Sequence, residues 1–207
     1  MTTGRILNIP NILTLARIGL IPVFLAVAYW PPAIGIAEHD TDMTRHVILT
    51  AIFVVAAVTD WFDGYLARTL NHTSAFGRFL DPVADKIIVC TALVLIVEHY
   101  SLYTDVLYPH LGKFITIPAM IIVAREITVS ALREWMAELG KRANVAVSWI
   151  GKWKTTIQLT AIAGLIWRHD EGMIYASVGL LMVATVLTIW SMIMYLKAGW
   201  VYMKDVK

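Results

Sequence analysis

The stretch VILTAIFVVAAVTDWFDGYLAR, residues 47–68, joins a long apolar run to two carboxylates and an arginine. Asp60 lies about 14 residues into the run, which corresponds to about 20 Å along a helix at 1.5 Å per residue. The hydrocarbon core of a bilayer is about 30 Å thick. The stretch therefore predicts a membrane helix that carries Asp60 below the membrane surface, where a carboxylate without a partner is costly.

The composition of the whole chain agrees with a membrane setting. Of its 207 residues, 58% are hydrophobic and 15% are charged, whereas about a quarter of the residues in a soluble domain are charged. A soluble globular domain and a disordered chain are both excluded on these grounds. The net charge of +2 comes with no separate basic face, so no nucleic-acid partner is expected. Cys90, the one cysteine, cannot form an intrachain disulfide and is interpreted as a core residue.

Five further apolar segments accompany the first, and about 20 such residues in a helix cross a bilayer. Helices are expected because lipid cannot satisfy a free backbone, and no alternating pattern indicates a barrel. The predicted spans are about 11–30, 47–67, 83–99, 114–135, 152–168 and 173–196. Arg17 and Pro22 in the first segment favour a retained helix over a cleaved signal. We expect one all-α transmembrane domain, an integral membrane six-helix bundle, over residues 1–207.

The basic residues predict the orientation of this bundle. Alternate segments carry thirteen of the 17 lysines and arginines, and the opposite segments carry Arg45, Lys113 and Arg168. Because loops on the cytoplasmic side are enriched in Lys and Arg, both termini are expected in the cytoplasm. The carboxylates at the end of the second span then lie on the cytoplasmic side.

The acidic residues of the second span share one helical face. Asp63 follows Asp60 by three positions, and side chains at this spacing are neighbours on a helix. Gly64 leaves the same face without a side chain, so a bulky group can approach the backbone there. Arg68 continues the face at its cytoplasmic end.

A second acidic face follows after the polar residues 71–74. Gly77, Asp81 and Asp85 recur at every fourth position, so they lie on one face if the segment is helical. Pro82 leaves two interpretations open: a helix that begins at Pro82 with Asp81 as its N-cap, or a longer helix kinked at the proline. In either case the hairpin over residues 60–85 is predicted to fold two acidic faces toward each other.

Four converging carboxylates would take up protons unless cations balance their charge. Oxygen ligands select hard cations, so Mg²⁺ or Mn²⁺ is expected, with two ions neutralising the four charges. A diphosphate group could bind beside Arg68 and the glycines. The residues alone also leave open a merely solvated acidic helix end or an ion pathway. The four expected metal ligands are Asp60, Asp63, Asp81 and Asp85.

These residues form the pattern D-x₂-D-G-x₂-A-R-x₈-G-x₃-D-x₃-D over 60–85, which we call the acidic signature. The pattern resembles the complete signature of the CDP-alcohol phosphatidyltransferases. Residues 8–17, 124–127 and 130–156 are similar to the branch of that family that uses glycerol 3-phosphate. The resemblance implies six transmembrane helices, a homodimer, a location in the bacterial inner (cytoplasmic) membrane, and an active site that opens to the cytoplasm.

The resemblance also implies a reaction and roles for the signature. The phosphatidyl group of CDP-diacylglycerol would pass to glycerol 3-phosphate, giving phosphatidylglycerol phosphate and CMP. The four aspartates would bind the metal ions, and Asp85 would also be the general base that accepts the proton of the attacking hydroxyl. The residues implied in binding the CDP group are Asp60, Gly64, Ala67, Arg68 and Gly77.

Glycerol 3-phosphate is a dianion, so a basic pocket is expected for it. The candidates are Arg125, Arg133, Lys152 and Lys154. Arg125 lies inside an apolar run, and its alternative is a structural ion pair with Glu126 or an aspartate. Lys152 and Lys154 have the alternative of ordinary cytoplasmic anchors. Arg17 either approaches the headgroup or snorkels to the membrane surface.

Two rival functions also fit the sequence. Another member of the family, acting on serine or inositol phosphate, would share the acidic signature, and only residues 124–156 favour glycerol 3-phosphate. An ion transporter would carry charged or broken positions along a continuous path, often in repeated halves. The acidic residues here gather on one side, and no internal repeat is present in the sequence.

Overall fold

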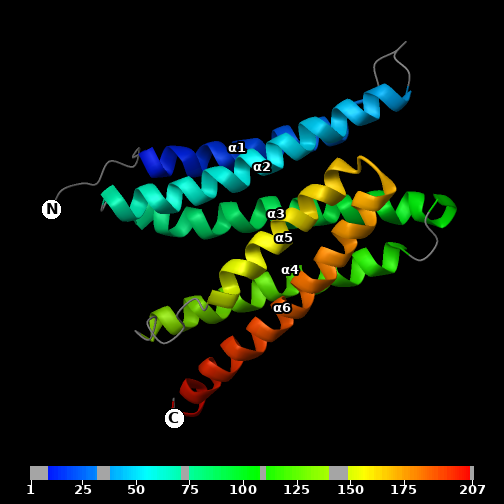
Figure 1. Cartoon of the computed structure of the whole chain (residues 1–207). Coiled ribbons are helices and arrows are strands. Elements are labelled where there is room, and N and C mark those ends of the chain that lie inside the picture. Colours follow the sequence, from blue (N-terminus) through cyan, green and yellow to red (C-terminus); the bar gives the residue numbers. More distant parts are fainter. Residues whose placement is uncertain (1–8, 32–37, 71–74, 108–110, 140–148, 206–207) are drawn as a thin grey trace. The chain divides into compact units, whose positions relative to one another are not determined.

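The computed structural model of the chain describes residues 9–31, 38–70, 75–107, 111–139 and 149–205, and these residues form long helices (Figure 1). No strand occurs in the described ranges. The helices are α1 (Ile9–Ala28), α2 (Glu38–Leu70), α3 (Ala75–Leu107), α4 (Leu111–Glu138), α5 (Trp149–Trp167) and α6 (Glu171–Asp205). The all-α fold of six helices is therefore confirmed.

Several helices are longer than the apolar segments that predict them. α2 and α3 contain 33 residues each and α6 contains 35. A helix of this length extends about 50 Å at 1.5 Å per residue, which exceeds the hydrocarbon core of about 30 Å. Hydropathy marks only the part of a helix that suits lipid, whereas hydrogen bonding continues the helix into polar sequence.

The start of α3 decides between the two interpretations of Pro82. α3 begins at Ala75, so the helix is already formed before Asp81 and Pro82 are reached. Asp81 as the N-cap of a helix starting at Pro82 is therefore wrong, and one longer helix through this segment is observed. A proline beyond the first turn removes one backbone hydrogen bond but does not by itself end a helix.

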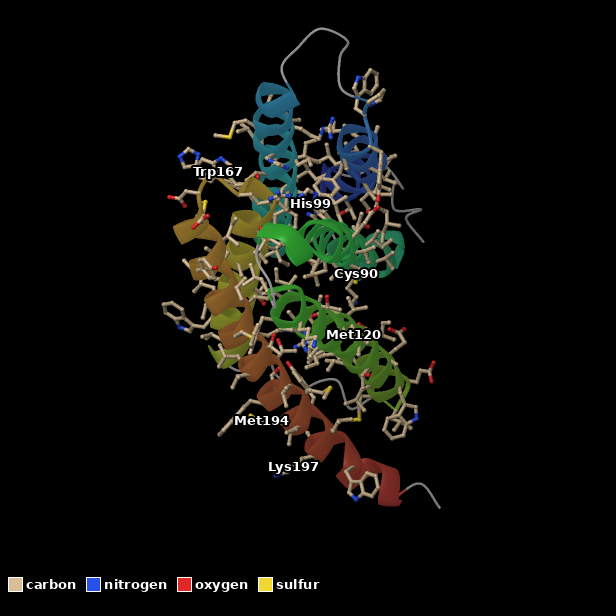
Figure 2. The ribbon with its side chains drawn as sticks, turned by 90° about the vertical axis from the view of Figure 1, so that its right-hand side faces the viewer. Cys90, His99, Met120, Trp167, Met194 and Lys197 are labelled. Carbon is tan, nitrogen blue, oxygen red and sulfur yellow. The ribbon has the colours of Figure 1, made fainter. Side chains whose placement is uncertain are left out.

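By length and hydropathy, three helices of the described part contain a segment suited to cross a membrane. These segments are Met43–Asp60, Leu111–Glu138 and Glu171–Trp200, and α1 adds the shorter apolar stretch Ile12–Ala28. Met120 on α4 and Met194 on α6 are among the exposed apolar side chains (Figure 2). Exposed apolar side chains along such helices are typical of a surface in contact with lipid. That all six helices cross the membrane stays a prediction.

The chain divides into two compact units. The first comprises Met1–Leu93 with Ala163–Glu171, and the second comprises Val94–Ile162 with Gly172–Lys207. In the first unit α1 packs along α2, as the blue and cyan helices of Figure 1 show. In the second unit α4 contacts both α5 and α6 through polar side chains and through the approach of Gly199 to Leu132.

Candidate active site

An ion pair joins α1 to the first aspartate of the acidic signature. Arg17 Nη1 donates to Asp60 Oδ1 at 2.6 Å. The side chain of Arg17 is 1% exposed, whereas that of Asp60 is 45% exposed. Arg17 therefore does not snorkel to the membrane surface, because a carboxylate on the neighbouring helix neutralises it where it is. The alternative of snorkelling is wrong.

Helical periodicity on both helices explains this contact. On α1 the buried residues Arg17, Ile21 and Phe24 follow one another at spacings of four and three. On α2 the buried residues Phe53 and Ala56 lie on the face that continues to Asp60. Residues at such spacings form one stripe along a helix. Arg17 and Asp60 therefore lie at the point where two packed apolar stripes give way to charge.

Asp60 remains open to a ligand on its other side. Within the described part of the chain its recorded partner is Arg17, which occupies one carboxylate oxygen. Asp60 is also the last residue of the apolar segment Met43–Asp60, so the carboxylate stands at the end of the lipid-suited part of α2. Such a group, half exposed and held on one side, is suited to bind a cation or a polar substrate.

The residues of each predicted acidic face lie on one continuous helix. That the two faces meet stays a prediction. α2 continues unbroken to Leu70, so Asp60, Asp63 and Gly64 lie on one helix at the spacings that place them on one face. α3 is helical from Ala75, so Gly77, Asp81 and Asp85 share a face as expected. The side chain of Asp85 is exposed. The remaining side chains of the signature lie outside the described residues: Asp63, Ala67, Arg68 and Asp81.

The described donors fit a hard divalent cation but do not form a complete site. No group of three or more His, Cys, Asp or Glu side chains gathers among the residues that the structure describes. Of the four predicted ligands, Asp60 and Asp85 have described side chains, and both are accessible carboxylates. Carboxylate oxygens are the ligands that Mg²⁺ and Mn²⁺ prefer. The two-ion site stays a prediction.

A second charged group, which we call the basic cluster, lies in the other unit and consists of Arg125, Glu126 and Lys154. Glu126 Oε1 accepts hydrogen bonds from Arg125 Nη1 at 2.5 Å and from Lys154 Nζ at 3.2 Å. The three side chains are 11%, 17% and 2% exposed, respectively. The cluster therefore links α4 to α5 and carries one net positive charge in a buried place.

The contacts in the basic cluster bear on the roles expected for Arg125 and Lys154. The ion pair of Arg125 with Glu126, expected as the structural alternative, is present. Lys154 is buried and paired, so it is not an exposed anchor at the membrane surface. Two cations share one carboxylate in the cluster, so one surplus positive charge is available to an anion. The acceptor role of these residues stays a prediction.

Arg133 and Lys152 complete the candidates. Arg133 Nη2 donates to Tyr195 Oη at 2.9 Å, and its guanidinium carbon lies 5.2 Å from the centroid of the same ring. Tyr195 thus combines a hydrogen bond with a cation–π contact and fixes an exposed arginine of α4 against α6. The side chain of Lys152 lies outside the described residues.

Two of these contacts, Arg133–Tyr195 and Arg17–Asp60, were not predicted from the sequence. Nothing in the sequence distinguishes Tyr195 from the many other aromatic residues. Its contact with Arg133, 62 positions away, therefore could not be predicted. The pairing of Arg17 with Asp60 had a usable signal: a charged residue in each of two apolar helices joined by a short connection. Since unpaired charge is costly in lipid, oppositely charged residues of adjacent membrane helices are candidates for pairing.

The sequence profile of the family described as CDP-alcohol phosphatidyltransferase matches residues 7–190. The chain belongs to this family. The match includes all of the acidic signature and most of each unit of the fold. The resemblance drawn from the signature is therefore confirmed at the level of the CDP-alcohol phosphatidyltransferase family.

Several bacterial relatives carry one and the same name. A protein of Escherichia coli (strain K12) is 52% identical over 193 residues, which cover 93% of this chain and 94% of its own. A protein of Haemophilus influenzae is 52% identical over 192 residues, covering 93% of each chain. A protein of Salmonella typhimurium is 51% identical over 192 residues, covering 93% and 94%. Each is named CDP-diacylglycerol–glycerol-3-phosphate 3-phosphatidyltransferase.

Proposed function

We propose that this protein transfers the phosphatidyl group of CDP-diacylglycerol to glycerol 3-phosphate, giving phosphatidylglycerol phosphate and CMP. One observation carries the proposal: identity of 51–52% over 93% of the chain to relatives named for this reaction. Likeness at this level extends far beyond the acidic signature and includes the segment around the basic cluster. The family alone supports only the donor class, whereas the relatives' names support the acceptor.

The acidic signature supplies the residues for the displacement at phosphorus. In the proposal Asp85 accepts the proton of the attacking hydroxyl of glycerol 3-phosphate, as a general base within hydrogen-bond reach can do. A bond forms between that oxygen and the phosphatidyl phosphorus, and the bond from this phosphorus to the bridging oxygen of CMP breaks. CMP leaves with the electron pair of the broken bond. The exposed position of Asp85 on α3 supports this role, because the acceptor is water-soluble.

Asp60, Asp63, Asp81 and Asp85 would hold two Mg²⁺ or Mn²⁺ ions. Bound there, such ions neutralise charge on the diphosphate and stabilise the leaving oxygen. The fit rests on the carboxylate donor set and on the open side of Asp60. In the same proposal the CDP group binds along one face of α2 and the start of α3, formed by Asp60, Gly64, Ala67, Arg68 and Gly77.

For the acceptor phosphate we propose the basic cluster together with Arg133 and Lys152. Arg125 and Lys154 share a single carboxylate, so an incoming dianion would meet a surplus of positive charge. Charge-assisted hydrogen bonds from buried cations to phosphate oxygens are strong and directional.

The membrane setting completes the proposal. The acyl chains of the donor stay in lipid while its headgroup meets the soluble acceptor at the cytoplasmic surface. In the proposal the protein lies in the bacterial inner membrane, has both termini in the cytoplasm and forms a homodimer. The bacterial relatives support the first point, and the distribution of Lys and Arg supports the second. The homodimer rests on the resemblance to the family alone.

Release of CMP by purified protein tests the reaction. The protein in detergent receives CDP-diacylglycerol and Mg²⁺ or Mn²⁺ with glycerol 3-phosphate, serine, inositol phosphate or water alone. Release that depends on glycerol 3-phosphate is expected. Release with a different alcohol would keep the chemistry and overturn the acceptor, and no release by folded protein would overturn the proposal in favour of a transporter.

A further inference from the structure

We infer that Arg17 is a positioning residue of the active site, which holds the Asp60 carboxylate in the orientation that binds the divalent cation. The inference rests on the proposed function of the acidic signature, to which Arg17 does not belong. The other residues proposed for the reaction lie on α2, α3, α4 and α5. The inference adds one residue of α1 to them. Arg17 itself need not touch the substrate or the cation.

The geometry of the ion pair supports this task. Arg17 Nη1 lies 2.6 Å from Asp60 Oδ1, and the arginine side chain is almost fully buried. A buried guanidinium keeps a fixed direction, because packing restricts its rotamers and its hydrogen bonds are planar. Asp60 by contrast is half exposed, so without Arg17 its carboxylate would be free to rotate. Hydrogen-bond partners behind metal ligands orient these ligands and influence their affinity for the metal.

The position of the pair in the helices points the same way. Packing of α1 against α2 brings buried residues of both helices together up to Asp60, where the apolar segment of α2 ends. Arg17 thus approaches Asp60 from the packed side of the helix pair. The exposed part of the carboxylate is left for a ligand.

Binding of Mn²⁺ without any substrate tests the inference. Free Mn²⁺ is measured by electron paramagnetic resonance while the full-length protein in detergent is titrated with the ion. We expect Arg17→Gln to weaken Mn²⁺ binding about 10–100-fold, the usual effect of removing a partner of a metal ligand. Arg17→Lys keeps the charge but not the planar fork, so it should recover part of the affinity. Arg45→Gln is the matched control, since Arg45 on α2 donates to the carbonyl of Trp30 instead.

Melting temperatures of the same samples separate positioning from folding. If Arg17→Gln fails to fold, the comparison of Arg17→Lys with the wild type decides the matter. Unchanged Mn²⁺ affinity in a folded Arg17 variant would overturn the inference. Tighter binding would overturn it as well, because Arg17 would then act only as a competing positive charge.

A double-mutant cycle tests whether Arg17 acts through Asp60. In the Asp60→Asn background, adding Arg17→Gln should change Mn²⁺ affinity little, because the oriented carboxylate is already lost. An equal loss in both backgrounds would show that Arg17 acts elsewhere. Absence of Mn²⁺ binding by the wild type would overturn the metal site and the inference together, whereas failure of the acceptor assay alone would leave the Mn²⁺ result intact.

Discussion

Asp85 differs from the other aspartates of the acidic signature because the proposal gives it a proton to accept. Asp85→Asn keeps the size of the side chain but removes its basicity. We expect turnover to fall by at least the factor of about 10²–10⁴ that general-base catalysis contributes. Since Asp85 is exposed, the melting temperature should change little.

CMP release by Asp85→Asn in the presence of glycerol 3-phosphate measures this effect. Glu98→Gln removes the same charge from an exposed site on α3 and serves as the control. It lies about 20 Å further along the helix at 1.5 Å per residue. Turnover near that of the control would remove Asp85 from the role of general base.

Arg125 is expected to act on the acceptor more than on the lipid donor. Arg125→Ala should raise the KM for glycerol 3-phosphate about tenfold to a hundredfold, because a hydrogen bond to a charged group contributes about 1.5–3 kcal/mol. The KM for CDP-diacylglycerol should change much less. Lys113→Ala removes an exposed charge from the same helix and is the control. An unchanged acceptor KM would make Arg125 a structural residue.

Glu126 should matter chiefly for stability. Glu126→Ala would leave Arg125 and Lys154 as two like charges in a buried place, and removal of one partner from a buried ion pair costs about 3–5 kcal/mol. Thermal melting in detergent should show a clear drop for Glu126→Ala and a smaller drop for Glu126→Gln, which keeps a hydrogen-bond acceptor. Glu134→Ala, at an exposed position on α4, is the control. Equal melting of all three variants would contradict the importance of the pair.

Among the elements, the end of α5 carries a conformation that few side chains favour. Arg168 has a φ of 52°, and its N–H donates to the carbonyl of Gly164 at 3.1 Å. This arrangement ends a helix with one left-handed residue, a position that glycine fills without steric cost. Arg168→Gly should therefore be more stable than Arg168→Ala by about 1 kcal/mol. Comparison of these two variants cancels the contacts of the arginine side chain, and equal melting temperatures would contradict the expectation.

Some features of the helices could be predicted from the sequence, and others could not. The six helices were predictable because each contains an apolar segment, and the acidic signature was predictable because its spacing matches a family. The start of α3 at Ala75 was not, since Pro82 offered a plausible first residue and no hydrophobic pattern marks the turns before it. Contacts such as Arg17–Asp60 and Arg133–Tyr195 join distant positions, so they depend on how helices pack rather than on local sequence.

For the whole molecule, the distribution of charge gives a testable orientation. Lys197, near the end of α6 in Figure 2, is followed by Lys204 and Lys207. Since basic residues favour the cytoplasmic side, the C-terminus is expected there. A green fluorescent protein fused to the C-terminus should fluoresce in bacterial cells, whereas alkaline phosphatase at the same site should be inactive. The opposite pattern would show that the predicted orientation is reversed, with the acidic signature outside the cytoplasm.

Transfer of the acceptor into lipid tests the central claim most directly. Purified protein in detergent micelles receives CDP-diacylglycerol, Mg²⁺ or Mn²⁺, and glycerol 3-phosphate labelled with ¹⁴C in its glycerol carbons. We expect the label to enter the lipid extract as phosphatidylglycerol phosphate, with one CMP released for each label transferred. CMP release without label in the lipid, from protein that is folded by its melting curve, would contradict the account.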